Sequence, residues 1–388
     1  MSDQPPIRIL HVCTSLGRGG IETWLMHVLR QMDRRRFAMD FLVHAIEEGA
    51  YEEEARALDA AVFRCPRPRA SRPGHYASCF RQALREHGPY DIVHSHMSAF
   101  SGYTLRLAQQ AGVPVRLAHV HNDLTTKDAG GSLPFKLYAR LMRALIHRHA
   151  TAGLACSGNA AASLYGPLWQ RDPRWQVLHY GICLAPFHHR PDRKTMRAEL
   201  GLPEEAMVIG HVGSFSAQKN HAFLLEIAAE VMRSDHGAWL LLVGDGPLRS
   251  AIEQKAQRLG IEGRTVFTGL RGDVPRLMSG AMDVFLFPSL YEGLGLVLVE
   301  AQAAGLPCLL SDVVPPEADV VTPSIRRLSL SAPASAWAEA ILAVRAIGSA
   351  LTQPDALEVV ESSQFNVRLG VRRLELAYSQ CQSSPMKP

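Results

Sequence analysis

The chain has 388 residues, and its 41 lysines and arginines outnumber its 37 aspartates and glutamates, which gives a formal net charge of +4. Hydrophobic residues make up 47% of the sequence and charged residues 20%, as in ordinary globular proteins. This composition excludes disorder and collagen-like repeats as the main architecture, and the small charge does not require nucleic acid as a partner. The length predicts roughly two to three domains that need no disulfide or metal for stability.

The first half of the sequence alternates apolar, β-branched runs with helical patterns. The expected strands are residues 7–12, 37–43, 91–94, 113–120 and 151–156, and the expected helices include residues 21–31, 103–111 and 135–149. Strand, turn and helix in regular succession are typical of a parallel, doubly wound sheet.

The pattern restarts after a connection at residues 186–194. The expected strands are then 208–212, 240–243, 265–268, 284–287 and 308–310, with a helix over 220–233. We therefore expect an N-terminal Rossmann-like domain over 1–185 and a C-terminal one over 186–362. Residues 363–388 would form a helix that packs back on the first domain and then a frayed tail. The predicted fold is α/β, with two doubly wound domains that face each other across a cleft and bind ligands beyond the carboxyl ends of their strands.

The cysteines and the N-terminus bear on location. None of the seven cysteines forms a C-x-x-C pair, which indicates reduced thiols. The N-terminal residues lack the basic and apolar regions of a signal peptide, and no apolar run reaches the roughly 18–20 residues of a membrane span. We expect a cytoplasmic protein.

Two features of the first half could serve a ligand. Gly17, Gly19 and Gly20 follow the first strand, where glycines allow a ligand to approach the backbone and the next helix offers free N–H groups. A tight turn would use the same glycines. The second feature is a set of histidines at predicted strand ends: His11, His94, His96, His119 and His121.

His121 is the better active-site candidate among these histidines, because Asn122 and Asp123 follow it where the strand meets a loop. Histidines two apart on a strand share a face and could hold a metal. No cysteine or carboxylate cluster completes such a site, however, and the chain contains no D-x-D motif. We therefore expect neither a metal ion nor another cofactor.

The second half offers a cation and two carboxylates. Lys219 lies between the first strand of this second half and the helix that follows it. Its charge and the helix N–H groups would suit a diphosphate there, although a solvated lysine in a polar turn is equally ordinary. Glu292 and Glu300 are eight positions apart, one in a loop and one two turns into a helix. Both carboxylates could accept hydrogen bonds from sugar or ribose hydroxyls, but the spacing alone is commonplace.

Taken together and in this order, the motifs resemble the family 4 retaining glycosyltransferases, in particular their exopolysaccharide-biosynthesis branch. The resemblance covers about residues 7–380. The matching motifs are Gly19-Gly20-Ile21-Glu22, His94-Ser95-His96, His119-Val120-His121-Asn122, Gln218-Lys219-Asn220-His221 and residues 282–312, in which Glu292 and Glu300 form an E-x7-E pair.

The resemblance implies a GT-B fold and transfer of a sugar from a nucleotide-sugar donor with retained anomeric configuration. Lys219 would neutralise the leaving diphosphate, Glu292 would hold the donor sugar, Glu300 would bind the ribose, and His121 would lie beside the reacting sugar. The remaining donor-binding residues that it implies are Gly19, Gly20, Gly293, Leu294 and Gly295. Two positions depart from the family: Ser214 replaces a usual arginine, for which Arg18 or Arg271 could compensate, and Gly295 replaces a frequent proline.

The acceptor side depends on the helix expected between Phe135 and His149. Its basic residues Lys136, Arg140, Arg143 and His147 lie beside a face of leucines. Such a helix can lie on an anionic membrane, and a solvated surface helix explains the pattern equally well.

We therefore predict a metal-independent, retaining hexosyltransferase in the cytoplasm, peripheral on the inner face of the membrane. It would use a UDP- or GDP-sugar and a saccharide or lipid-linked saccharide acceptor in cell-surface polysaccharide biosynthesis, without nucleic acid. The alternatives are a sugar-nucleotide epimerase of the same architecture and a weakly active nucleotide-sugar-binding partner of another transferase.

Overall fold

The computed structural model describes residues 5–67, 74–347 and 351–383, and the chain divides into two compact units. Unit 1 comprises residues 1–181 together with 367–388, and unit 2 comprises residues 182–366. The expected division near residue 185 lies close to the point where the chain leaves unit 1. Of the tail at 382–388 that we expected to be frayed, residues 382 and 383 belong to the last helix instead, and residues 384–388 lie outside the described residues.

Unit 1 contains a seven-stranded sheet in the order β3-β2-β1-β4-β5-β6-β7, and all its strand pairs are parallel. Its strands are β1 (Ile7–Cys13), β2 (Phe37–Val43), β3 (Val62–Arg64), β4 (Ile92–Ser95), β5 (Val115–Val120), β6 (Ala152–Ala155) and β7 (Trp175–Val177). The central strands are almost entirely buried apolar runs, because helices cover a parallel sheet on both faces.

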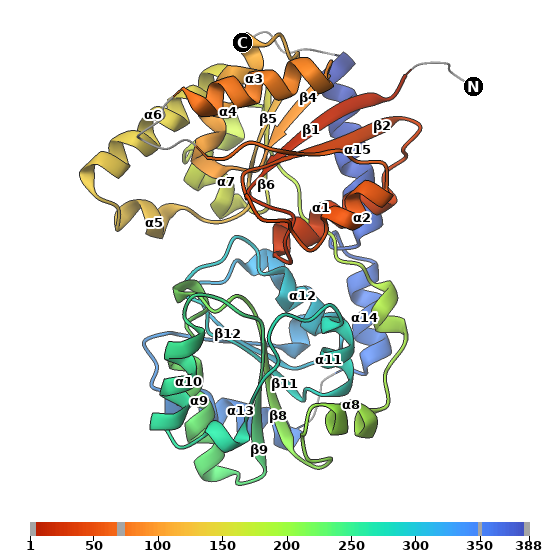
Figure 1. Cartoon of the computed structure of the whole chain (residues 1–388). Helices are drawn as coiled ribbons and strands as arrows, with labels where there is room; N and C mark the ends of the chain where they lie inside the picture. The colour runs from red at the N-terminus through yellow and green to blue at the C-terminus, as the bar shows by residue number, and fades with distance from the viewer. Residues whose placement is uncertain (1–4, 68–73, 348–350, 384–388) are drawn as a thin grey trace. The chain divides into compact units, whose positions relative to one another are not determined.

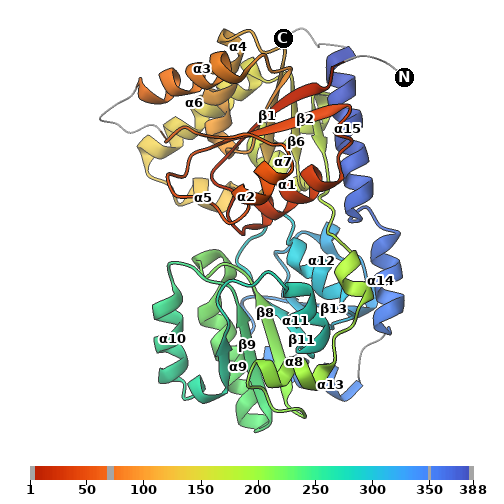
Figure 2. The ribbon, with the colours of Figure 1, turned by 45° about the vertical axis from the view of Figure 1, so that its right-hand side comes forward.

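The helices of unit 1 lie on both sides of this sheet (Figures 1 and 2). They are α1 (Gly20–Gln31), α2 (Glu52–Ala57), α3 (His75–His87), α4 (Ser101–Gln110), α5 (Thr125–Ala129), α6 (Leu133–His149), α7 (Gly158–Tyr165) and α15 (Val367–Ser383). The last helix packs against α1, and the buried Tyr378 hydroxyl lies 2.7 Å from Nδ1 of His94 on β4. The C-terminal helix therefore completes the core of unit 1.

Unit 2 contains a six-stranded parallel sheet in the order β10-β9-β8-β11-β12-β13. The strands are β8 (Met207–Val212), β9 (Ala238–Val243), β10 (Thr265–Phe267), β11 (Val284–Phe287), β12 (Cys308–Ser311) and β13 (Ile325–Leu328). The helices are α8 (Arg193–Glu199), α9 (His221–Ser234), α10 (Arg249–Arg258), α11 (Val274–Gly280), α12 (Leu296–Ala303), α13 (Ala334–Ile347) and α14 (Gln353–Glu361). Each unit is thus a parallel α/β sheet, as the sequence predicts.

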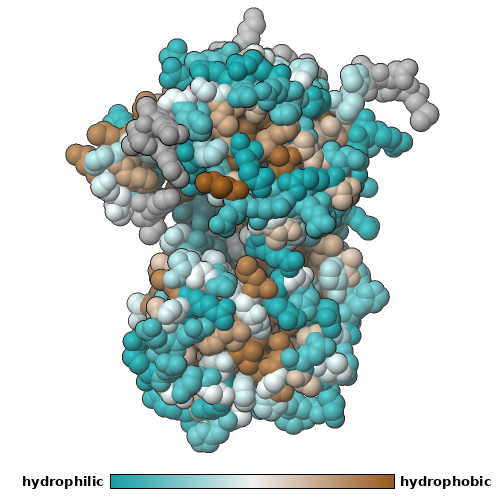
Figure 3. Space-filling model, in the orientation of Figure 1, coloured by the Kyte–Doolittle hydropathy of each residue, from teal (hydrophilic) through white to brown (hydrophobic). Residues whose placement is uncertain are grey.

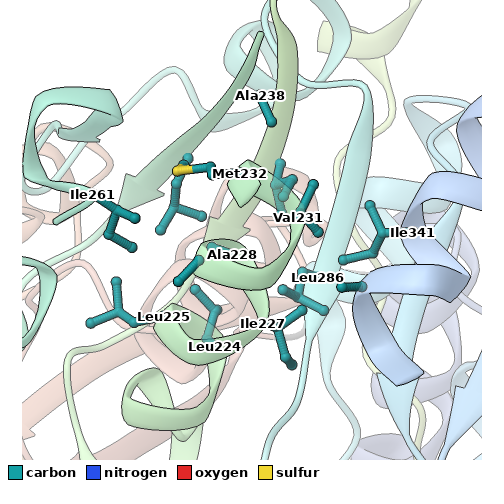
Figure 4. Packing of buried hydrophobic residues seen from close by; sticks show 14 of the residues in the cluster. Leu224, Leu225, Ile227, Ala228, Val231, Met232, Ala238, Ile261, Leu286 and Ile341 are labelled. Atoms are coloured by element: carbon teal, nitrogen blue, oxygen red, sulfur yellow. The ribbon is translucent and has the colours of Figure 1, made fainter. Parts of the chain in front are cut away.

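The core of unit 2 is built around α9. Its residues Leu224, Ala228 and Val231 repeat at helical spacing and are buried, and Figure 4 shows them beside Leu286 of β11 and Ile341 of α13. This packing anchors α9 along its length. The start of the helix, and with it the preceding loop, is therefore held at the carboxyl end of β8.

Helix α6 carries an unusual outer face. Leu133, Leu137 and Leu141 recur every fourth residue and are 71%, 60% and 57% exposed. Apolar atoms accordingly gather over the outer end of α6 at the left of Figure 3. Lys136 and Arg140 are also exposed, but Arg143 turns inward and pairs with Asp128, so it does not belong to the basic face. Within the described residues, no helix is both long and apolar enough to traverse a bilayer.

Candidate active site

The glycine turn of unit 1 lies between β1 and α1. Gly20 is the first residue of α1, and Gly19, which has no side chain, occupies the cap position. A Cβ added to Gly20 would meet nothing within 4 Å. Packing within unit 1 therefore does not require glycine there, and a ligand that approaches the backbone remains a reason for it.

His121 lies just beyond the end of β5, and both of its ring nitrogens are engaged. Its Nε2 lies 2.8 Å from Nδ1 of His96, and its Nδ1 is hydrogen bonded to the Tyr180 hydroxyl. Burial lowers the pKa of His121 to about 3, so the ring is neutral near pH 7. The imidazole therefore has no nitrogen left for a sugar unless one of these bonds opens.

The other histidines lie beside His121 because their strands are neighbours in the sheet. His11 of β1 is in register with His94 of β4, and His119 belongs to the adjacent β5. Within the described part of the chain, two sets of three histidines are close enough to hold a metal ion: His11, His94 and His96, and His96, His119 and His121. Their nitrogens, however, already lie 2.8–3.0 Å from one another, which are hydrogen-bond distances between two rings.

The central feature of unit 2 is an ion pair. Lys219 ends a short 3-10 turn, and Asn220 in the left-handed conformation then starts α9. Lys219 Nζ lies 2.7 Å from Glu292 Oε1, and the Gln218 amide donates to Glu292 Oε2 at 3.1 Å. The two charged side chains are only 12% and 5% exposed. The structure thus brings together two of the predicted site residues, which are far apart in the sequence.

The loop after Glu292 ends in a conformation that explains one departure from the family. Gly295 caps α12 with φ of +84°, and no side chain caps this helix. Proline is fixed near φ of −65° and cannot adopt this conformation. Proline could therefore not replace Gly295 without a change in the backbone of this loop. Leu294 is buried, whereas Gly295 is only partly so.

Glu300 lies in the second turn of α12, where it is partly enclosed by protein. Burial raises the pKa of this carboxyl from its ordinary 4.5 to about 7. Among the described residues, none forms a hydrogen bond or ion pair with its side chain. The carboxylate is therefore available to a ligand that donates hydrogen bonds.

Ser214 is exposed, and its hydroxyl oxygen lies 3.1 Å from that of Ser216. Arg271, one of the two cations that could replace the missing arginine, forms two hydrogen bonds of 2.8 Å with Asp273. Arg18 is exposed at the glycine turn of unit 1. Of the two candidates, only Arg271 is already held by a carboxylate.

Two residues of the site escaped the sequence analysis. Gln218 is adjacent to Lys219, so the motif itself offered a signal for it. Tyr180 comes from the connection after β7, and nothing in its local sequence links it to the histidines.

Two family models together match most of the chain. Residues 19–181 match the glycosyl transferase 4-like domain, and residues 192–348 match the glycosyl transferases group 1. The putative glycosyltransferase EpsF of Bacillus subtilis is 39% identical over 344 residues, which is 88% of each chain. The chain belongs to the group 1 glycosyltransferases. The predicted family is therefore confirmed.

Other relatives agree with this assignment. A UDP-Gal:α-D-GlcNAc-diphosphoundecaprenol α-1,3-galactosyltransferase of Escherichia coli is 31% identical to this glycosyltransferase over 58% of each chain. The crystal structure of Anabaena HepE with UDP and glucose matches 96% of the chain and 99% of its own, with a TM-score of 0.81 and 20% identity. WaaG, a glycosyltransferase involved in lipopolysaccharide biosynthesis, has a TM-score of 0.75 at 20% identity over 95% of this chain and 99% of its own. These likenesses, with two parallel Rossmann-like sheets, confirm the GT-B fold.

Proposed function

We propose that this glycosyltransferase moves a hexose from a UDP- or GDP-sugar to a saccharide or lipid-linked saccharide acceptor in cell-surface polysaccharide biosynthesis. The reaction retains the anomeric configuration and needs no metal ion. The ion pair of Lys219 and Glu292 at the start of α9 carries this proposal. The names of the relatives support the two substrate classes, since one acts on a diphosphoundecaprenol-linked sugar and HepE was crystallised with UDP and glucose.

Lys219 acts on the leaving group. As the bond between the anomeric carbon and the diphosphate breaks, negative charge grows on the phosphate oxygens. The ammonium group of Lys219 and the free N–H groups of α9 are fixed where they can stabilise that charge. Lys219 exchanges its carboxylate partner for the diphosphate, which releases Glu292.

The released Glu292, with the backbone N–H groups of Gly293, Leu294 and Gly295, holds the hydroxyls of the donor sugar. Glu300 accepts hydrogen bonds from the ribose, for which its unpaired carboxylate is suited. Gly19 and Gly20 approach the diphosphate, and His121 lies beside the reacting sugar. Catalysis then depends on positioning and charge stabilisation of an oxocarbenium-like transition state, without a covalent intermediate.

The exposed leucines of α6, which are Leu133, Leu137 and Leu141, support a peripheral position on the inner face of the membrane. Three leucines that are each more than half exposed on one face form an apolar strip that suits contact with lipid. Lys136 and Arg140 flank them and would meet anionic headgroups.

The membrane contact can be tested with sedimentation of anionic phospholipid vesicles. Leu137→Glu with Leu141→Glu should lower the bound fraction several-fold. Leu376→Glu is the matched control, because this leucine of α15 is also 60% exposed in unit 1. Equal binding by all three proteins would count against the membrane contact.

The transferase activity can be tested with a panel of UDP- and GDP-sugars and lipid-linked saccharide acceptors. We expect acceptor-dependent release of nucleotide, a product with the donor's anomeric configuration in NMR spectra, and full activity in EDTA. Lys219→Ala and Glu300→Gln should abolish most of the transfer. Conversion of the donor to its epimer without acceptor would instead indicate an epimerase.

A second candidate is a nucleotide-sugar-binding partner of another transferase, which the exposed Ser214 and the Asp273-bound Arg271 favour. Donor binding in calorimetry without turnover on any acceptor would support it. Higher activity of Ser214→Arg would support the transferase.

A further inference from the structure

A chain of hydrogen-bonded rings runs through the interior of unit 1, from β1 to α15. Its members, in order, are His11, His96, His121, Tyr180, His119, His94 and Tyr378. Apart from the bond between His121 and Tyr180, the distances between the paired atoms are 2.7–3.1 Å. The rings come from five separate segments of the sequence. No carboxylate or lysine is a member of this row of hydrogen-bonded rings.

All five imidazoles are neutral, because burial lowers the pKa of each of them. A neutral imidazole has one N–H and one nitrogen lone pair. A histidine in the middle of the chain must therefore donate on one side and accept on the other. The direction of one bond then fixes the direction of the next until a tyrosine hydroxyl is reached.

The end of the chain at His11 sets that direction. Its Nε2 is buried, and within the described residues it has no hydrogen-bond partner. Buried N–H groups without an acceptor are rarer in proteins than acceptors without a donor, so Nε2 carries the lone pair and Nδ1 the proton. His11 then donates from Nδ1 to Nε2 of His96, which in turn donates from Nδ1 to Nε2 of His121. His121 donates from its own Nδ1 to the Tyr180 oxygen.

We propose that Tyr180 is a positioning residue that holds His121 as a neutral imidazole with its proton on Nδ1. His96, which is itself bonded to His11, donates to the other nitrogen of His121, so both nitrogens of that ring are hydrogen bonded. This inference rests on the proposed function in that His121 lies beside the reacting sugar. His121 then fixes the shape of the site and takes no proton from the acceptor. The proton that the acceptor hydroxyl loses goes to a phosphate oxygen of the leaving nucleoside diphosphate.

The tautomers can be measured in the unmodified full-length protein with 15N-labelled histidine. Long-range 1H–15N NMR spectra near pH 7 should show a protonated Nδ1 and an unprotonated Nε2 for His11, His96 and His121, with signals assigned from single histidine-to-glutamine variants. A protonated Nε2 or a charged ring at His121 would overturn the proposal. One equivalent of Zn²⁺ should leave these signals unchanged, and their loss on stoichiometric binding would show a metal site instead.

Tyr180→Phe tests the positioning role, because it removes only the hydroxyl that accepts from His121 and also pairs with His119. We expect the Nδ1–H signal of His121 to shift or broaden and kcat to fall about tenfold or more, with KM for the donor unchanged. Tyr165→Phe is the matched control. Tyr165 is also buried in unit 1, but its hydroxyl lies 2.8 Å from the carbonyl oxygens of Ala118 and Leu154 and outside the ring chain.

Tyr165→Phe should keep the histidine signals and kcat within about twofold of the wild type. An equal loss of kcat in both variants, or an unchanged His121 signal in Tyr180→Phe, would refute the positioning role. The NMR result does not depend on turnover, so it stands even if no donor and acceptor pair shows transfer.

Discussion

Replacing Glu300 with glutamine should stabilise the unliganded protein and at the same time weaken donor binding. Burial raises the pKa of Glu300 from 4.5 to about 7, so the folded protein holds this proton more tightly than the unfolded chain does. At about 1.4 kcal/mol per pH unit, this difference corresponds to about 3 kcal/mol. Ionisation of Glu300 therefore lowers the free energy of unfolding increasingly as pH rises from 4.5, and this effect reaches its full size above pH 7.

Urea unfolding of the wild type and Glu300→Gln at pH 5 and pH 8.5 measures this cost. Glutamine cannot ionise, so the variant should be more stable by about 3 kcal/mol at pH 8.5 and by less than about 1 kcal/mol at pH 5. Calorimetry with the donor nucleotide should show binding weakened about 10- to 100-fold, since hydrogen bonds to a charged carboxylate are lost.

Glu339→Gln is the matched control, because Glu339 is exposed on α13 of the same unit. It should change the free energy of unfolding at neither pH. If Glu300→Gln follows the wild type at both pH values, or is less stable at pH 8.5, burial does not disfavour the charge of Glu300 and the reasoning fails.

Three further predictions concern the two units. Lys219→Met or Glu292→Gln alone leaves one nearly buried charge unpaired and should lower the free energy of unfolding by about 3 kcal/mol. In a double-mutant cycle, the variant with both substitutions should recover much of this loss. Additive losses would mean that the two charges are not coupled. Gly244→Ala should lower the melting temperature and solubility, because Gly244 has φ of +139° and a Cβ there would overlap the carbonyl oxygen of Gly213; a variant as stable as the wild type would contradict the packing at this turn. Below pH 6.5, histidines in the unfolded chain become protonated, whereas the buried histidines of the folded protein stay neutral. Each buried imidazole such as His121, with its pKa near 3, therefore lowers the free energy of unfolding by about 1.4 kcal/mol per pH unit. Urea unfolding of unit 1, followed by fluorescence between pH 7 and 5, should show this decline, and a flat profile would refute it.

Much of the fold could be predicted because the central strands are buried apolar runs. The prediction for β2 (Phe37–Val43) coincides with the observed strand, and those for β1 and β8 differ only at their ends. The strands that were missed lie at sheet edges. Val62–Arg64 and Trp175–Val177 have three residues each, too few for a periodic pattern, and Ile325–Leu328 contains two arginines.

The site was predictable residue by residue but not as a set of contacts. Lys219 and Glu292 are each marked by a motif, yet their ion pair joins positions 73 residues apart. The histidines are marked by their places at strand ends, whereas Tyr378 reaches His94 across 284 residues of sequence. The first contact depends on β8 and β11 being neighbours in the sheet, and the second depends on how α15 packs. Local propensity contains no information about either.

The placement of α15 in unit 1 has a consequence for synthesis on the ribosome. Unit 2 is one continuous segment, so it can fold as soon as residue 366 has emerged. The sheet of unit 1 is made much earlier, but its core lacks Tyr378 and the rest of α15 until the final residues are translated. A nascent chain therefore exposes the unfinished face of unit 1 for most of its elongation. A premature stop shortly before residue 367 would leave a folded unit 2 attached to a first unit with an open core, which is a target for chaperones and proteases.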